Sequence, residues 1–242
     1  MNVAGAGGWP EREVVADEYS AGSVAFSGGG DRRRGLVALV MKVAGASAHA
    51  SGVWGVVVGA VLAAYMLFFF RDPERTAPAD PNAVVAGADG TVAGIAEVKD
   101  DKILKADAVR ISIFLSLFSV HVNRAPIAGK ARFLGYFPGK RYFTFQAKSS
   151  ELNQHNSILI QGAETRCLVH QIVGPVARRV VYWLDHDRDV TVAKGERLGM
   201  MKFGSRLDML FPKGDVDVVV KPGDKVRAGA TVVARLRGGN RS

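Results

Sequence analysis

The sequence predicts a mainly β domain, a hairpin-rich sandwich or barrel with helix only at its margins, preceded by an N-terminal apolar membrane segment. Two observations predict it. After residue 80, apolar residues collect in short runs that Gly, Pro and Asp separate, which is the pattern of strands and turns. From Val43 to Phe70, the chain is largely apolar and carries no fixed charge. The 242 residues provide room for one such domain and an anchoring segment.

Residues 1–34 are predicted to form a disordered tail. They are rich in Gly and small polar residues, lack apolar periodicity and end in three arginines. The sequence just after them has the outline of a signal peptide, with an apolar run at 36–45 and a small-residue cleavage site at 48–50. Lys42 interrupts that run, so a cleaved signal peptide is the less favoured interpretation.

Residues 35–70 are predicted to associate with the membrane. At about 1.5 Å rise per residue, a helix over 52–70 would span roughly 28 Å, which is close to the thickness of a bilayer's hydrocarbon core. The alternative is a buried core helix, which seldom runs this long without a charge.

The topology of this segment has two solutions. Basic residues before it outnumber those after it, so a single span would keep the N-terminus in the cytosol and place the β domain outside. If residues 36–50 also enter the bilayer, a hairpin would return the chain to the cytosol. We expect the protein to be located at the cell membrane, with the β domain on the cytoplasmic face. The choice between a hairpin and a single span stays open.

A proline-containing linker follows at 71–80, and the β domain begins after it. A short helical turn could lie within 148–154. The predicted strands are apolar or β-branched runs, at 84–86, 109–122, 157–161, 167–173, 179–184, 217–220 and 231–236.

The formal net charge of +9 indicates an anionic partner. The chain lacks zinc-finger spacing, a helix-turn-helix pattern and an aromatic RNA-binding motif, so we expect an acidic membrane surface and not a nucleic acid. The single Cys167 excludes an internal disulfide and a Cys-rich metal site, and we expect no bound metal. In the strand-like run 166–169, it is predicted to be a small buried apolar residue.

The most informative stretch is GMMKFGSRLD at 199–208. It resembles the processing site of the short, bacterial-type phosphatidylserine decarboxylases, which cut themselves at a Gly-Ser bond. The resemblance continues in order along the chain, and its further motifs are FFRDP at 69–73, AGADGTV at 86–92, ISIFL at 111–115, VHVNRAP at 120–126 and VGPVARR at 173–179.

The resemblance implies that the domain at 71–242 is a pyruvoyl decarboxylase domain, cleaved between Gly204 and Ser205 into chains 1–204 and 205–242 that stay associated. The Ser205 hydroxyl would attack the Gly204 carbonyl and convert the amide into an ester, a reaction that requires a base. Elimination and hydrolysis would then leave a pyruvoyl group, the covalent cofactor, in place of Ser205. A Schiff base between this group and the amine of phosphatidylserine would lead to phosphatidylethanolamine and CO2.

His121 is the candidate acid or base, because imidazole titrates near neutrality. Asp89 is the candidate carboxylate that orients it, as in a Ser-His-Asp arrangement. The sequence departs from longer relatives at one point, because Arg124 stands where they carry the second of two histidines, the one tied to self-cleavage. Whether His121 serves self-cleavage, decarboxylation or both stays open.

Cationic partners are expected for the substrate's phosphate and carboxylate, and the candidates are Arg124, Arg132 and Arg206. The remaining histidines, at 49, 155, 170 and 186, are predicted to be structural.

The sequence is compatible with two other functions. The run at 220–229 resembles the hairpin of biotinyl and lipoyl carrier domains, and Lys202 lies about where such domains carry their modified lysine. The alternative is thus a membrane-tethered carrier domain modified at Lys202. The other is a non-enzymatic basic membrane-binding protein in which Ser205 never matures.

Overall fold

The computed structural model describes residues 48–140, 142–144, 152–174, 180–202 and 205–238. The chain forms two compact units, Met1–Phe68 and Phe69–Ser242. Several predictions lie outside the described residues: the disordered tail, the apolar run at 36–45, most of the short helix within 148–154, and Gly204.

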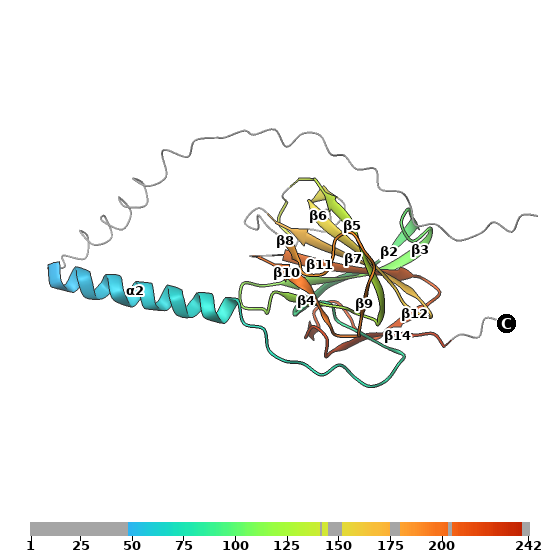
Figure 1. Ribbon diagram of the computed structural model, residues 1–242, viewed down its shortest axis with the longest axis horizontal. Coiled ribbons are helices and arrows are strands. Elements are labelled where there is room, and N and C mark those ends of the chain that lie inside the picture. The colour runs from blue at the N-terminus through green and yellow to red at the C-terminus, as the bar shows by residue number, and fades with distance from the viewer. Residues whose placement is uncertain (1–47, 141, 145–151, 175–179, 203–204, 239–242) are drawn as a thin grey trace, which may run out of the picture. The chain divides into compact units, whose positions relative to one another are not determined.

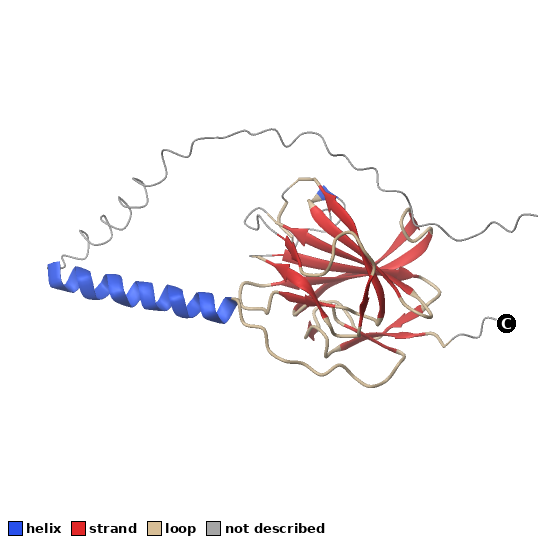
Figure 2. Cartoon of the chain, in the orientation of Figure 1, coloured by secondary structure: helices blue, strands red, loops and turns tan. Residues whose placement is uncertain are grey.

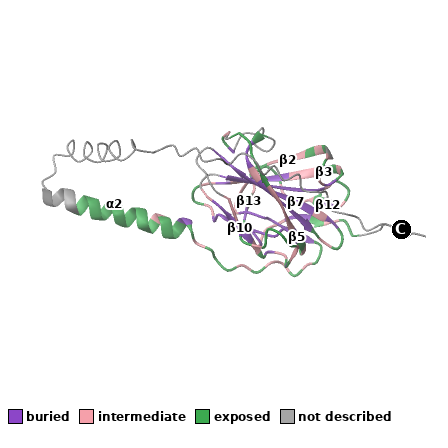
Figure 3. Ribbon diagram, turned by 45° about the horizontal axis from the view of Figure 1, so that its top comes forward, coloured by how far each residue is buried: buried purple, intermediate pink, exposed green. Residues whose placement is uncertain are grey.

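The helix α2 (Ala48–Phe69) is apolar along its length, with no acidic residue in its first turn and no basic residue in its last. Its side chains are described from Val53 on, and nearly all are exposed (Figure 3). Within the described residues, no helix meets the combined length and hydropathy of a membrane span. The membrane segment therefore stays a prediction.

The second unit is built from strands (Figures 1 and 2). They are β1 (Ala83–Val85), β2 (Gly90–Asp101), β3 (Ala106–Leu115), β4 (Val122–Arg124), β5 (Gly129–Phe137), β6 (His155–Gln161), β7 (Arg166–Val173), β8 (Val180–Tyr182), β9 (Val190–Val192), β10 (Arg197–Met201), β11 (Ser205–Pro212), β12 (Val216–Val218), β13 (Lys225–Val226) and β14 (Val232–Leu236). The prediction of a mainly β domain is confirmed.

The strands form three antiparallel sheets. The largest has the order β13-β2-β3-β11-β7-β6-β5-β9, and the two smaller ones have the orders β1-β14-β12 and β4-β10-β8. One apolar core joins them, because residues of the large sheet such as Ile113 and Leu207 belong to the same buried cluster as Val84 of β1, Leu198 of β10 and Val233 of β14. Burial of these side chains is the main stabilising contribution to the fold.

The strand β11 lies at the centre of the large sheet. It pairs with β3 from Ser205 opposite Leu115 to Pro212 opposite Ala108, and with β7 from Ser205 opposite Val173. All of its residues except the last are buried. The residue at which cleavage is expected therefore begins a strand that is held on both edges.

Two predictions about the strands were wrong in detail. The run at 109–122 is not one strand, because a turn at 116–119 separates β3 from β4. The likeness of 220–229 to a carrier hairpin does not hold either, because β12 pairs with β14 whereas β13 pairs with β2. The runs predicted at 157–161, 167–173 and 231–236 correspond to β6, β7 and β14.

Candidate active site

Ser205 is fully buried as the first residue of β11. Successive side chains of a strand point to opposite faces, so Ser205 shares its face with Leu207 and Met209, which belong to the apolar core. Among the described residues, its Oγ has no hydrogen-bond partner. Buried hydroxyls are normally paired, so an unpaired one marks a position reserved for chemistry or for a ligand.

His121 lies at the same end of the large sheet, where the connection from β3 reaches β4. Its Nδ1 lies 2.9 Å from the carbonyl oxygen of Ser119, and its own carbonyl accepts a hydrogen bond from the Met201 N–H at 3.1 Å. Since a carbonyl can only accept, Nδ1 carries the proton in the neutral ring and Nε2 presents a lone pair. In the described part of the chain, this buried Nε2 has no partner.

Burial lowers the pKa of His121 below its ordinary value, partly offset by the Ser119 carbonyl; Arg71 lowers this pKa further and Asp89 raises it. The ring of Phe69 covers the imidazole, with ring centroids 4.2 Å apart and planes inclined at 33°. Phe69 is itself fully buried. The histidine is therefore neutral at neutral pH and shielded from water on one side, as a general base requires.

A chain of buried amides leads toward this region. Gln171 donates from Nε2 to Oδ1 of Asn123 at 2.7 Å, and Asn156 donates from Nδ2 to Oε1 of Gln171 at a long 3.5 Å. The Nδ2 of Asn123 has no partner among the described residues. Counting partners among the described residues alone, His121, Asn123 and Ser205 thus each hold one unsatisfied buried polar atom.

Asp89 does not hydrogen-bond to His121 in the structure. Its carboxylate accepts two hydrogen bonds from Arg75, at 2.6 and 2.8 Å, and one from the Ala228 N–H at 2.7 Å. The oxygen that fixes the histidine ring is the Ser119 carbonyl instead. Asp89 acts on His121 through its charge, which raises the pKa of the histidine.

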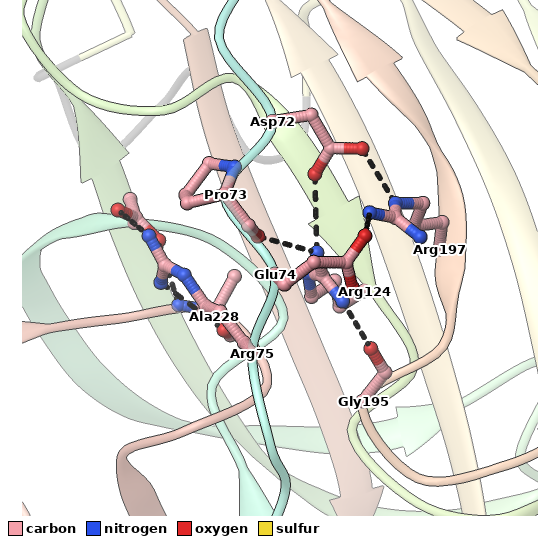
Figure 4. Close-up of polar contacts among 9 residues, drawn as sticks. Asp72, Pro73, Glu74, Arg75, Arg124, Gly195, Arg197 and Ala228 are labelled. Carbon is pink, nitrogen blue, oxygen red and sulfur yellow. Dashed lines mark hydrogen bonds and ion pairs between the residues drawn. The ribbon is translucent and has the colours of Figure 1, made fainter.

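Arg124, expected from the sequence as a departure from a two-histidine pattern, holds the linker at 71–80 against the domain (Figure 4). It donates to Asp72 at 3.1 Å, to the Pro73 carbonyl at 3.0 Å and to the Gly195 carbonyl at 2.9 Å. Arg197 also pairs with Asp72. The sequence FFRDP is thus a docking segment whose aspartate bridges two arginines.

The other two candidate phosphate ligands also have protein partners. Arg206 is buried, lies on the face of β11 opposite to Ser205, and bonds to Asp208 at 2.7 Å and to the Ser112 hydroxyl at 2.5 Å. Arg132 makes a two-bond pair with Asp189. These contacts give both arginines structural roles.

Three of the remaining histidines, His155, His170 and His186, and Cys167 have structural surroundings. His170 bonds to the Ser157 hydroxyl at 2.8 Å and packs against the ring of His155, and burial lowers the pKa of His170 to about 3. His186 packs against aromatic rings, and the side chain of His49 is outside the described residues. Cys167 is buried, which raises the pKa of its thiol well above its usual range.

The carrier-domain alternative places Lys202 at the tip of a hairpin. In the structure, Lys202 lies between β10 and β11, which belong to different sheets and do not pair. Its ammonium group lies 5.7 Å from the centre of the Phe70 ring. This position does not match an exposed hairpin tip.

Sequence reasoning missed Phe69, Ser119 and Asn123. Phe69 belongs to the predicted apolar segment, and the carbonyl of Ser119 carries no sequence signal at all. For Asn123 there was a signal, since a polar amide two residues after His121 on a short strand shares its face.

Comparisons with known proteins identify the family. The sequence model of a family described as Phosphatidylserine decarboxylase matches residues 62–234. A chain named Phosphatidylserine decarboxylase proenzyme from Carboxydothermus hydrogenoformans is 44% identical over 174 residues, which cover 72% of this chain and 81% of the relative. The chain of the same name from Salinibacter ruber is 46% identical over 176 residues, covering 72% and 76%. That from Desulfotalea psychrophila is 40% identical over 174 residues, covering 72% and 80%.

Proposed function

Because the chain belongs to the phosphatidylserine decarboxylase family, we propose that it is the precursor of an enzyme that converts phosphatidylserine to phosphatidylethanolamine and CO2 in phospholipid biosynthesis. The observation that carries the site assignment is the buried hydroxyl of Ser205 at the head of β11, at the end of the sheet where the neutral imidazole of His121 also lies. Neither the Ser205 Oγ nor the His121 Nε2 has a partner in the part of the chain that the structure describes.

Self-cleavage begins at Ser205. Nε2 of His121 takes the hydroxyl proton while Oγ bonds to the Gly204 carbonyl carbon; the peptide C–N bond breaks, and the released nitrogen is protonated. Loss of the Cα proton then expels the Gly204 carboxylate, and water replaces the nitrogen, which leaves as ammonia. The Ser119 carbonyl supports this role, because it keeps the proton on Nδ1 and the lone pair on Nε2.

The surroundings of Ser205 fit a pyruvoyl group. The position is buried, its polar atom has no protein partner in the described residues, and neighbouring strands hold the backbone on both sides. That group would supply a carbonyl that binds the substrate amine and accepts the electron pair released with CO2. Nε2 of His121 would return a proton to the substrate carbon after CO2 leaves, and the covering Phe69 ring would keep water away.

The chains 1–204 and 205–242 would stay associated after the cut. Strand β11 pairs with β3 and β7, β14 pairs with β1, and β13 pairs with β2, so strands of the small chain are held by strands of the large one. A segment as short as 205–242 has too little core to fold alone.

The same proposal places the enzyme at the cell membrane, anchored through residues 35–70, with its β domain on the cytoplasmic face. The exposed apolar side chains of α2 support an apolar surrounding for this helix, and the net charge of +9 suits an anionic lipid surface.

Mass spectrometry of the purified protein tests the cleavage. We expect a chain beginning at position 205 with a blocked N-terminus, and its partner ending at Gly204. Ser205→Ala should remain one uncut chain without decarboxylase activity, because alanine offers no oxygen for the acyl shift. Cleavage of that variant at the same bond would refute the mechanism.

A further inference from the structure

The turn between β3 and β4 presents two large apolar side chains to solvent. Leu117 is 45% exposed and Phe118 is 71% exposed. The turn is tightly bonded: the Ser119 N–H donates to the Ser116 carbonyl at 3.0 Å, the Ser116 N–H donates to the Ser119 hydroxyl at 3.2 Å, and the two hydroxyls lie 3.1 Å apart. We call residues 116–119 the tip loop. These hydrogen bonds constrain the turn in a conformation that leaves Leu117 and Phe118 exposed.

Cations and a further apolar ring adjoin the tip loop. Arg71 donates from Nη2 to the Phe118 carbonyl at 2.8 Å. Phe70, next to Arg71 in the chain, is 41% exposed, and the Lys202 ammonium lies 5.7 Å from its ring centre. An apolar tip flanked by Arg and Lys is the composition of a surface that enters the headgroup layer of an anionic bilayer.

The tip loop is also directly bonded to the candidate active site. The Ser119 carbonyl at its base holds Nδ1 of His121, and Lys202 lies three residues before Ser205. Whatever binds the tip is therefore brought within a few residues of the reacting groups. For a substrate whose acyl chains stay in the bilayer, the reactive group must reach the lipid headgroups.

We propose that the tip loop inserts Leu117 and Phe118 into an anionic bilayer surface, with Arg71 and Lys202 facing the lipid phosphates, so that a headgroup is presented to His121 and Ser205. This proposal rests on the decarboxylase function for its substrate, but the insertion itself can be measured without turnover.

The direct test attaches an environment-sensitive fluorophore at position 118. The only native cysteine is the fully buried Cys167, so Phe118→Cys can be labelled selectively. The full chain is reconstituted in vesicles of phosphatidylcholine and phosphatidylglycerol that contain a nitroxide-labelled acyl chain. We expect strong quenching at position 118 and little at position 219, labelled in Val219→Cys as an exposed apolar control next to β12.

Equal quenching at the two positions, or none at position 118, would overturn the insertion. A signal at position 118 that follows protein concentration in vesicles without nitroxide would also overturn it, because it would show that the tip contacts a second copy of the chain.

Activity provides the second test. Phe118→Ser should self-cleave normally, because the side chain is mostly exposed. Its activity on phosphatidylserine in vesicles should fall roughly tenfold, which is the order expected when a large apolar side chain loses an apolar environment. Activity on a short-chain, water-soluble phosphatidylserine should stay unchanged, as should both activities of Val219→Ser. Equal losses on both substrates would contradict the proposal. If the unaltered chain decarboxylates neither lipid, the proposed function fails, and the quenching experiment still decides the insertion.

A different observation points to a role for Asn123. Because Asn156 donates to Oε1 of Gln171, the Gln171 Nε2 faces Asn123, and Asn123 must turn its Oδ1 toward it. Its Nδ2 is then left buried and unpaired within the described residues. His121 lies two residues earlier, just before β4, and Gln171 lies two residues before Val173, the cross-strand partner of Ser205.

We infer that Nδ2 of Asn123 donates a hydrogen bond to the Gly204 carbonyl oxygen as it becomes negatively charged during self-cleavage. A fixed donor with no other partner is what such an oxyanion requires. This inference also rests on the proposed function, and Ser205→Ala supplies the uncut reference.

The test variant is Asn123→Asp, which keeps the shape and the acceptor for Gln171 but removes the donor. Self-cleavage should slow by about 10²–10³-fold. Hydroxylamine cleaves esters and not amides, so it should not restore cleavage in Asn123→Asp. Rescue by hydroxylamine, or cleavage at the normal rate, would overturn the inference. If Asn123→Asp does not fold, as shown by its thermal melt, Asn123→Leu is subjected to the same two criteria.

Discussion

The pairing of Asp89 with Arg75 allows a prediction that separates a structural from a catalytic carboxylate. Both side chains are largely buried, 13% and 12% exposed, and share two hydrogen bonds. Asp89 also accepts from the backbone of Ala228, and Arg75 donates to the Ala228 carbonyl at 3.2 Å. We predict that Asp89 acts mainly by fixing the linker and the chain around residue 228.

The magnitude follows from the geometry. Removing one member of a buried ion pair typically costs 3–5 kcal/mol, and partial exposure places this pair near the lower end, at about 3 kcal/mol. For a domain of this size, about 1 kcal/mol shifts Tm by roughly 2–4 °C, so Asp89→Asn should lower Tm by roughly 6–12 °C. Arg75→Met should have a similar effect, because it leaves Asp89 with one backbone donor.

Thermal unfolding should be measured in the uncut Ser205→Ala background, so that every variant is a single chain. A double-mutant cycle of Asp89→Asn and Arg75→Met should give a coupling free energy of about 1.5–3 kcal/mol. Self-cleavage is then followed in the Ser205 background, well below the lowered Tm. Both single variants should cut at similar rates, within about tenfold of the unaltered chain.

One result would refute this reasoning. If Asp89→Asn loses about 10²–10⁴-fold in cleavage rate while Arg75→Met cuts normally, Asp89 would be serving His121 directly. The orienting role expected from the Ser-His-Asp pattern would then hold, and the bonds to Arg75 would have to rearrange during cleavage.

Two further predictions concern histidines. His121→Gln should stay mostly uncut if Nε2 is the processing base. Cleavage is followed by gel and turnover by release of CO2. Normal cleavage together with normal turnover would show that His121 is not part of the site. His170 has a pKa lowered from 6.5 to about 3, so it favours folding above pH 6.5 and this contribution is lost as the pH falls from 6.5 toward 3. In the uncut Ser205→Ala background, the free energy of unfolding should therefore fall more steeply with pH over that window when His170 is present than in His170→Gln. The difference in slope should be up to about 1.4 kcal/mol per pH unit. Equal slopes would contradict the lowered pKa of His170.

The strands that sequence predicted well are those with uninterrupted β-branched and apolar runs. Strand β7 is an example, and its buried Cys167 was expected in that position. Strand β11 was not predicted as a strand, because it is covered on both faces and shows no alternation of buried and exposed residues. Arg206 and Asp208 look like surface residues in the sequence, and only the fold reveals that they neutralise each other while buried.

The candidate site shows the same division. Ser205 and His121 could be named because their chemistry requires those residue types, and the resemblance to a family located them in the chain. The partners of Asp89 and Arg124 could not. Arg75 lies 14 positions from Asp89, and the other partners are farther away, Ala228 at 139 positions from Asp89 and Asp72 and Gly195 at 52 and 71 positions from Arg124. Pairing at such separation is decided by the folded topology.

The position of Ser205 suggests why a chain can cut itself here without losing its structure. The cut would fall immediately before the first residue of the central strand, and none of the ladder pairs of β11 lies upstream of it. The new terminus would therefore keep Leu115 on one side and Val173 on the other, which limits its motion. Had the serine been placed at an edge strand, the same cut would free a row of unpaired backbone groups beside a reactive carbonyl. Because β11 begins at the reacting residue, the small chain is paired to the large chain on both sides at the position where the chemistry requires a fixed geometry.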